Sequence, residues 1–213
     1  MPGNLGPKPK ASRPKTWAKK KKKKSGMTNR ATIATKLGKP TWTNRQTRSH
    51  AQQAKQLWSV VEQFSGHPLL VDFTAKLIER AKVPARDEVA LARAVRRFAT
   101  QRVKFFREYP ERFVSPLRTI VWGIGDCDDK SILIASMLRG FRIPVRLKFL
   151  RLTLPNKTRV GHVYPQALLD GQWVALESVR PYPWGYDPEQ RAREKGFKVE
   201  TQYVGDKQDT PHA

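Results

Sequence analysis

The apolar pattern of this chain changes from a helical period to a strand period near residue 142, and this change limits the fold more than any other feature. Upstream, apolar residues recur three and four positions apart in "AQQAKQLWSVVEQF", "HPLLVDFTAKLIERA" and "PARDEVALARAVRRFATQRVKFF", as in amphipathic helices. Downstream, "IPVRLKFLRLTL" alternates apolar and basic residues, and "VGHVYPQALL" and "QWVALESV" follow as further strands. Helices followed by an antiparallel sheet predict an α+β domain.

An Asp-Gly pair at 170–171 is a strong signal for a two-residue β-hairpin loop. If these two residues form the loop, the register of the hairpin puts His162 opposite Val179, with Glu177 two residues away on the same face. His162 and Glu177 then become diagonal neighbours, roughly 7 Å apart at the backbone and within side-chain reach. A histidine beside a carboxylate is the arrangement that a general base and its orienting group require.

The only cysteine of the chain, Cys127, lies in "GIGDCDDKSILIASMLRGFRIPVR" (residues 123–146), where a loop becomes a helix. Asp126 is a good N-cap and Asp129 completes the pattern of a capping box, so we expect Cys127 to be the first helical residue. Unpaired N–H groups at a helix start lower the pKa of a thiol, whereas the acids Asp126, Asp128 and Asp129 raise it. The sequence therefore leaves two interpretations open, a nucleophile and a small buried side chain.

Residues from about 90 to 185 resemble the core of the transglutaminase-like cysteine hydrolases, through a Gly-Asp-Cys helix start, a His-Val-Tyr strand and a Trp-Val-x-Leu-Glu strand. The resemblance implies a papain-like fold and a triad of Cys127, His162 and Glu177, in which the thiolate attacks an amide and water or an amine resolves the acyl-enzyme. Glu177 departs from the family, where Asp is more usual. For the oxyanion hole, the Cys127 backbone N–H is one natural donor, and Trp122 is a further candidate.

The "GDCDD" form, together with a basic N-terminal tail, is similar to transglutaminase-like proteins that tailed bacteriophages encode among their structural genes. This similarity implies a protein of the host cytoplasm or the virion. Three functions remain open. The first is a cysteine hydrolase or acyltransferase that acts on a polypeptide amide, and the second is an inactive virion structural or assembly protein that uses the fold as a scaffold. The third is a nucleic-acid-binding accessory factor in which the domain is incidental.

Composition excludes several other classes of protein. With one cysteine and four dispersed histidines, the sequence shows no zinc-ligand spacing, and we expect neither a metal nor a cofactor. No apolar run approaches the roughly 20 residues that span a membrane, and the basic start lacks the apolar region of a secretory signal peptide.

Most of the formal net charge of +24 comes from the N-terminal region, since residues 1–50 hold 15 Lys and Arg and no Asp or Glu. We predict a disordered polybasic arm that binds a polyanion, DNA or RNA, through counterion release, or contacts other virion proteins. The alternatives are an acidic protein surface or an anionic membrane as the partner, a nuclear-localisation signal if the host is eukaryotic, and a solvated tail that only adds solubility. The proposed polyanion-binding residues are Lys19, Lys20, Lys21, Lys22, Lys23 and Lys24.

The predicted organisation has three parts. The arm covers residues 1–48, and the transglutaminase-like domain covers 49–186. Within this domain the helical part is 49–115, and the cysteine helix and sheet are 116–186. A polar C-terminal tail, 187–213, contains "KGFKVETQYVG", which is a candidate for one more short strand.

Overall fold

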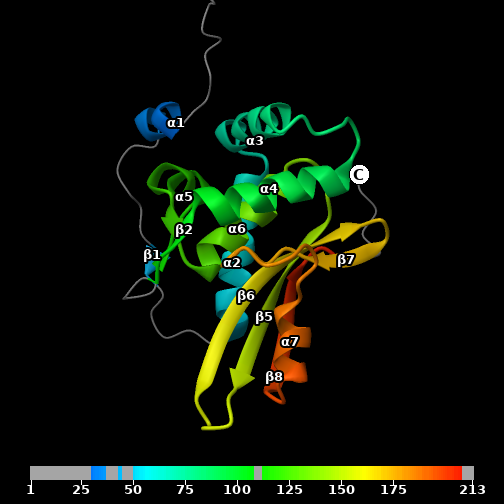
Figure 1. Ribbon diagram of the computed structural model, residues 1–213. Helices are drawn as coiled ribbons and strands as arrows, with labels where there is room; N and C mark the ends of the chain where they lie inside the picture. Colours follow the sequence, from blue (N-terminus) through cyan, green and yellow to red (C-terminus); the bar gives the residue numbers. More distant parts are fainter. Residues whose placement is uncertain (1–29, 37–42, 45–49, 108–111, 208–213) are drawn as a thin grey trace, which may run out of the picture.

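The computed structural model describes residues 30–36, 43–44, 50–107 and 112–207 (Figure 1). Most of the helices pack against one face of a four-stranded antiparallel sheet, and α7 lies against the other face, so the α+β class predicted from the sequence is confirmed. The helices are α1 (Arg30–Lys36), α2 (His50–Ser65), α3 (Pro68–Arg80), α4 (Glu88–Arg102), α5 (Pro116–Trp122), α6 (Cys127–Arg139) and α7 (Pro188–Glu194). None of the helices in these residues is long and apolar enough to cross a membrane.

The sheet has the strand order β7-β6-β5-β8, with every neighbouring pair antiparallel. Its strands are β5 (Val145–Thr153), β6 (Arg159–Leu169), β7 (Gln172–Ala175) and β8 (Lys198–Gly205). The hairpin register matches the prediction, since Leu169 pairs with Gln172. Asp170 and Gly171 have φ angles of 48° and 76°, which suit a tight hairpin turn that needs positive φ at both positions.

Helix α6 occupies the centre of the molecule, where it contacts α2, α4, α5 and β6. All of its residues from Asp128 to Leu138 are buried. At its C-terminal end, a Cβ on Gly140 would lie 2.4 Å from the carbonyl oxygen of Ser65 at the end of α2, so only glycine allows this close approach. Contacts on all sides fix the position of the N-terminus of α6, where Cys127 lies.

Short strand pairs connect the helical part to this N-terminus. Strand β2 (Lys104–Phe105) runs parallel to β4 (Ile124–Gly125), which directly precedes Asp126. Strand β1 (Thr43–Asn44) pairs with β3 (Arg112–Phe113). As a result, the segment after α4 lies beside the start of α6.

Two short elements, α1 and β1, fall within residues 1–48, which the sequence assigned to the arm. Helix α1 contacts α5 and buries Ile33 completely in the core. A short helix of this kind depends on tertiary packing rather than on its own propensity, which is why the sequence pattern did not reveal it. The Lys19 to Lys24 run lies outside the described residues.

The segment from residue 187 onward, which the sequence assigned to a polar tail, contains β8, a strand of the sheet, and α7, which packs on it. The candidate strand in "KGFKVETQYVG" is confirmed and pairs with β5 along eight residues. Asp187 begins α7 as its N-cap, and its carboxylate accepts hydrogen bonds from the Glu189 N–H and the Tyr164 hydroxyl. The hydroxyl bond crosses to β6 and attaches this segment to the sheet.

Candidate active site

Cys127 begins α6 through the capping box that the sequence predicted. The Asp126 carboxylate accepts the backbone N–H groups of Asp128 at 2.9 Å and Asp129 at 3.3 Å, and the Asp129 carboxylate accepts the Asp126 N–H at 3.3 Å. The other oxygen of Asp129 accepts the Val114 N–H at 2.9 Å. These bonds fix where the helix starts, and therefore where the thiol lies.

His162 and Glu177 form a hydrogen-bonded pair, with 2.5 Å between His162 Nε2 and Glu177 Oε2. The second oxygen of Glu177 accepts the Val179 N–H at 2.6 Å. The His162 ring also stacks on Tyr164, with 5.9 Å between ring centroids. Because Nε2 is taken by Glu177, Nδ1 is the ring nitrogen left to exchange a proton with another group.

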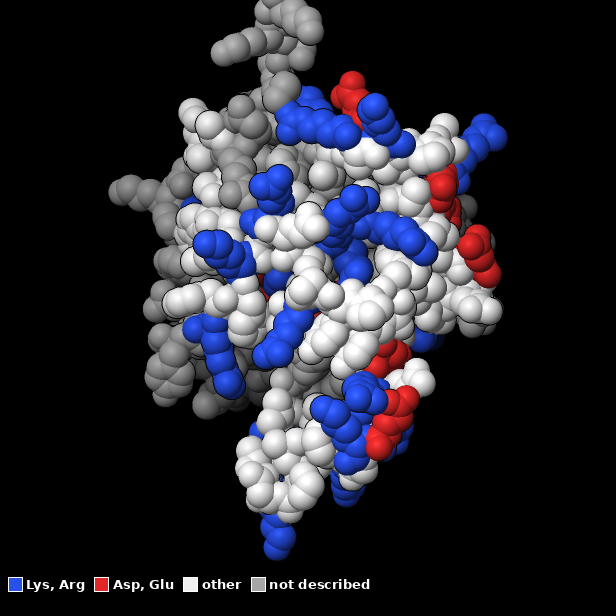
Figure 2. All heavy atoms as spheres, viewed as in Figure 1, with Lys and Arg blue, Asp and Glu red and all other residues white. Residues whose placement is uncertain are grey.

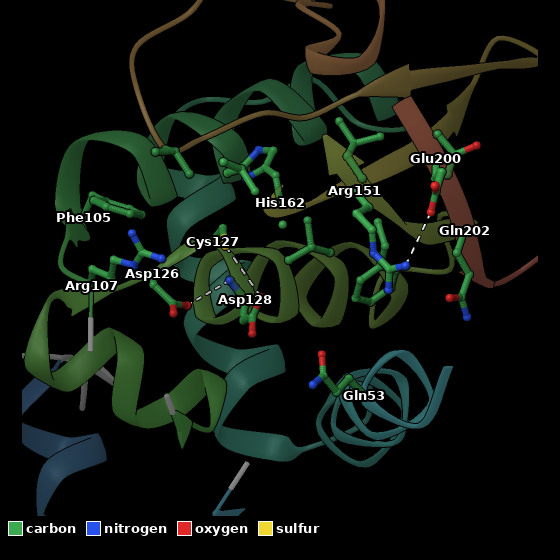
Figure 3. Close-up of a pocket in the computed structure, with 17 residues that line it drawn as sticks. Gln53, Phe105, Arg107, Asp126, Cys127, Asp128, Arg151, His162, Glu200 and Gln202 are labelled. Atoms are coloured by element: carbon green, nitrogen blue, oxygen red, sulfur yellow. Dashed lines mark hydrogen bonds and ion pairs between the residues drawn. The ribbon is translucent and has the colours of Figure 1, made fainter. Parts of the chain in front are cut away.

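Cys127 and His162 line the same cavity of about 570 Å³. In Figure 3 the two side chains lie close to each other on its wall, Cys127 from the start of α6 and His162 from β6. Glu177 contacts His162 and lines a smaller cavity of about 210 Å³ that also includes His162. The three residues of the predicted triad therefore converge in space.

Trp122 does not join them. Within the described residues, the lining of the larger cavity omits Trp122, whose ring lies under the Arg118 guanidinium at 5.9 Å. Of the two oxyanion donors considered from the sequence, the backbone N–H of Cys127 is the one that the geometry favours, since it begins a helix beside the cavity.

A side-chain bridge links the cysteine helix to the histidine strand. The Ser131 hydroxyl contacts the carbonyl oxygens of Cys127 at 2.6 Å and Val163 at 3.1 Å. Ser131 is one turn after Cys127, and Val163 follows His162. This bridge sets the spacing between the first turn of α6 and β6, and with it the spacing of the two side chains.

The sequence left open whether the pKa of the Cys127 thiol is lowered or raised, and in the structure it is raised. Burial raises the pKa of Cys127 well above its usual value, and the carboxylates of Asp128 and Asp126 raise it further. The Cys127 sulfur lies 3.6 Å from an oxygen of Asp128. Burial first, and then the acids, therefore hold the pKa of the thiol high, and Cys127 is protonated in the resting protein.

Glu177 is ionised. Burial by itself would raise the pKa of this carboxyl group, but the hydrogen bond and charge of His162 and the N–H of Val179 outweigh burial and hold it below its usual value. With a side chain only 3% exposed, the carboxylate acts on His162 with little solvent screening.

Asp129 differs from Glu177, because its role is to support the helix start. Burial, with a contribution from Asp126, raises the pKa of Asp129 to about 8.

One set of possible metal donors exists in the described residues: atoms of Asp126, Cys127 and Asp128 lie within 4.8 Å of one another. The capping bonds of Asp126 account for its position without an ion.

The sequence analysis missed two basic residues near the site: Arg96 holds the segment behind His162, and Lys130 holds the residue that follows α4. Arg96 on α4 donates to the carbonyl oxygens of Glu177, at 2.7 Å, and Tyr182. Lys130 on α6 is 1% exposed and donates to the Val103 carbonyl at 2.9 Å. Burial lowers the pKa of Lys130 to about 8, partly opposed by the charge of Glu177. The Arg96 contact joins residues 81 positions apart, so local pattern carries no signal for it.

The protein has an α+β fold with a cysteine at the start of a helix and a histidine on a strand beside it, as the resemblance to the transglutaminase-like cysteine hydrolases implies. More specifically, residues 72–178 match the family model of the transglutaminase-like superfamily. The match covers half of the chain, and the protein belongs to this superfamily. The family predicted from the sequence is confirmed, whereas the bacteriophage origin stays a prediction.

Three solved structures are among those similar to this chain. A candidate cysteine protease from Cytophaga hutchinsonii is 14% identical, with a TM-score of 0.44 over 68% of this chain and 51% of that chain. Calcium-bound LapG of Legionella pneumophila is 17% identical, with a TM-score of 0.42 over 68% and 81%. A candidate protease from Parabacteroides distasonis is 11% identical, with a TM-score of 0.39 over 59% and 26%. The chain spans about half the length of the first, and no curated protein sequence matches it.

Proposed function

We propose that this protein is a cysteine hydrolase or acyltransferase that acts on an amide or peptide bond through Cys127, His162 and Glu177. The observation that carries the proposal is the His162–Glu177 hydrogen bond beside a cavity that Cys127 and His162 share. Membership of the transglutaminase-like superfamily supports a cysteine-hydrolase type of function.

The order of events follows from the hydrogen bonds. Glu177 accepts from Nε2 of His162, so Nδ1 takes the proton of the Cys127 thiol while the sulfur attacks the carbonyl carbon. The new C–S bond leaves a negative oxygen that the Cys127 backbone N–H can stabilise. The imidazolium then gives its proton to the leaving amine as the C–N bond breaks. Water or another amine attacks the resulting thioester and releases the thiol.

The raised pKa of the thiol determines which form of this mechanism fits the site. Since burial and Asp128 keep Cys127 protonated at rest, the proton leaves during the attack rather than before it. His162 acts as a general base, and the ionised Glu177 stabilises the imidazolium that forms.

The direct test is to trap the acyl-enzyme. We expect an activated ester to acylate Cys127 of the full chain, detected by mass spectrometry of the intact protein and its peptides. Cys127→Ala should give no adduct at this position, and His162→Ala should slow acylation strongly. Acylation of the wild type at the rate of an unfolded thiol, unchanged in His162→Ala, would show that no catalytic pair exists.

A second candidate function is a non-catalytic scaffold, and the raised thiol pKa is the observation that favours it. In this case the protein is a virion or assembly protein, phage-encoded as the sequence resemblance suggests, and its arm binds nucleic acid. Polyanion binding should then fall steeply with salt and be lost when residues 1–29 are removed. The deletion stops before α1 because α1 packs on the domain.

A further inference from the structure

A basic stripe runs along α4 and into β2. Between Val89 and Arg107 the chain has six Lys or Arg and no Asp or Glu. In Figure 2 the region over α4 shows blue side chains without red ones, while acids gather at the edge of the molecule and over α7. The exposed cations of this stripe are Arg93, Arg97, Arg102, Lys104 and Arg107.

The stripe ends at the cavity that contains Cys127. Strand β2 pairs with β4, which directly precedes the cysteine helix, and the residues on either side of Phe106 line the cavity. These are Phe105, whose side chain is 48% exposed, and Arg107. In Figure 3 both lie at the Cys127 end of the cavity, and the Arg107 guanidinium points into it.

The two cations that line the cavity differ in their partners. Arg151, at the opposite end, lies 3.4 Å from Glu200 of β8. No carboxylate in the described part of the chain forms an ion pair with Arg107 (Figure 3). Within the described residues, the Arg107 guanidinium therefore faces the cavity without a carboxylate partner, and its N–H groups can pair with a carboxylate of a bound ligand.

We propose that this cavity binds an acidic polypeptide segment, with Arg107 pairing with a carboxylate next to the amide presented to Cys127. The inference rests on the proposed function and specifies its substrate class. Phe105 supplies an apolar surface beside the pair, and the stripe on α4 attracts further carboxylates and speeds encounter.

The observations favour a peptide over a nucleic acid. A nucleic-acid strand carries a phosphate at every residue and would bring several of them past Asp126, Asp128 and Glu200, which also line the cavity. A peptide can place its carboxylates at Arg107 and along the stripe, and leave neutral residues beside these acids. Its backbone also supplies the amide that the proposed chemistry needs.

The test measures binding rather than turnover. The protein is the full chain with Cys127→Ala, and the probe is a fluorescein-labelled peptide rich in Glu around one Gln, followed by fluorescence anisotropy. Arg107→Glu should weaken its affinity about fivefold to tenfold, since a charge reversal removes one partly exposed ion pair and adds a repulsion. Arg142→Glu is the matched control, because Arg142 is exposed and lies beyond the other end of α6, about 20 Å from Cys127.

A matching peptide with every Glu replaced by Gln should bind weakly, and Arg107→Glu should change its affinity little. A Lys-rich peptide should bind the protein with Arg107→Glu more tightly than the protein that keeps Arg107. Equal effects of Arg107→Glu and Arg142→Glu would overturn the proposal. So would a loss of single-stranded DNA binding in Arg107→Glu with no change for the Glu-rich peptide. If Cys127 never acylates but the Arg107-dependent binding holds, the binding site stands and the proposed catalysis fails.

Discussion

Replacing Glu177 by Gln changes the charge behind His162 while keeping the size of the side chain. In the wild type, Glu177 accepts from His162 Nε2 at 2.5 Å and from the Val179 N–H at 2.6 Å, and its side chain is 3% exposed. Glutamine offers one acceptor oxygen and an NH₂ group for these two donors. One of the two bonds is therefore lost, and no negative charge remains to stabilise an imidazolium.

The size of the effect follows from the geometry of the pair. Opposite charges with centres about 4 Å apart, at an effective dielectric constant of about 20, interact by about 4 kcal/mol. This value applies to the step in which His162 takes the thiol proton, so its full loss corresponds to about a thousandfold in rate. Because the His162 side chain is 21% exposed, solvent recovers part of the loss, and we expect the rate to decrease by about a hundredfold to a thousandfold.

The assay is the rate of iodoacetamide alkylation of Cys127 at pH 7, followed by intact mass. Glu200→Gln is the matched control: it makes the same chemical change on the wall of the same cavity, where Glu200 pairs with Arg151 rather than with His162. Its rate should stay within about threefold of the wild type. A folded Glu177→Gln protein that is alkylated as fast as Glu200→Gln would refute the reasoning.

Two further predictions concern the residues around the pair. Arg96→Met removes the donor to the Glu177 and Tyr182 carbonyl oxygens, so alkylation of Cys127 should slow about tenfold at pH 7. Arg96→Lys should recover part of the rate. Equal rates in the two variants and the wild type would contradict this role of Arg96. For Asp129, burial raises the pKa from about 3.8 in the unfolded chain to about 8, so the folded state keeps a proton that the unfolded state loses. The free energy of unfolding, measured with urea, should therefore fall by up to about 5 kcal/mol between pH 4 and pH 8. Asp129→Asn should make this decline smaller. A wild-type protein whose free energy of unfolding rises over this range would contradict the prediction.

Features set by local rules were predictable from the sequence. The Asp-Gly pair at 170–171 fixed the hairpin register, and the period of two in strands then put His162 and Glu177 on one face. The spacing of Asp126 and Asp129 marked the start of the cysteine helix in the same way. These rules involve residues close in sequence, or joined by one tight turn, and tertiary packing does not override them here.

Features set by tertiary contacts were not predictable. Helix α1 is stabilised by burying Ile33 against the domain, and α7 is attached through the Asp187 bond to Tyr164. The sign of the Cys127 pKa shift depends on how deeply the helix start is buried, which periodicity does not give. The contact between Arg96 and the Glu177 carbonyl joins distant parts of the chain, and only the assembled fold shows it.

The most direct test of the central claim, that His162 takes the proton of Cys127, is the pH dependence of Cys127 alkylation in the wild type and in His162→Ala. Because the thiol is protonated at rest, we predict a wild-type rate at neutral pH that depends on His162 and falls at least tenfold in His162→Ala, with the two curves converging at high pH. One common curve for both proteins, rising only above about pH 8.5 as for an ordinary thiol, would contradict the account.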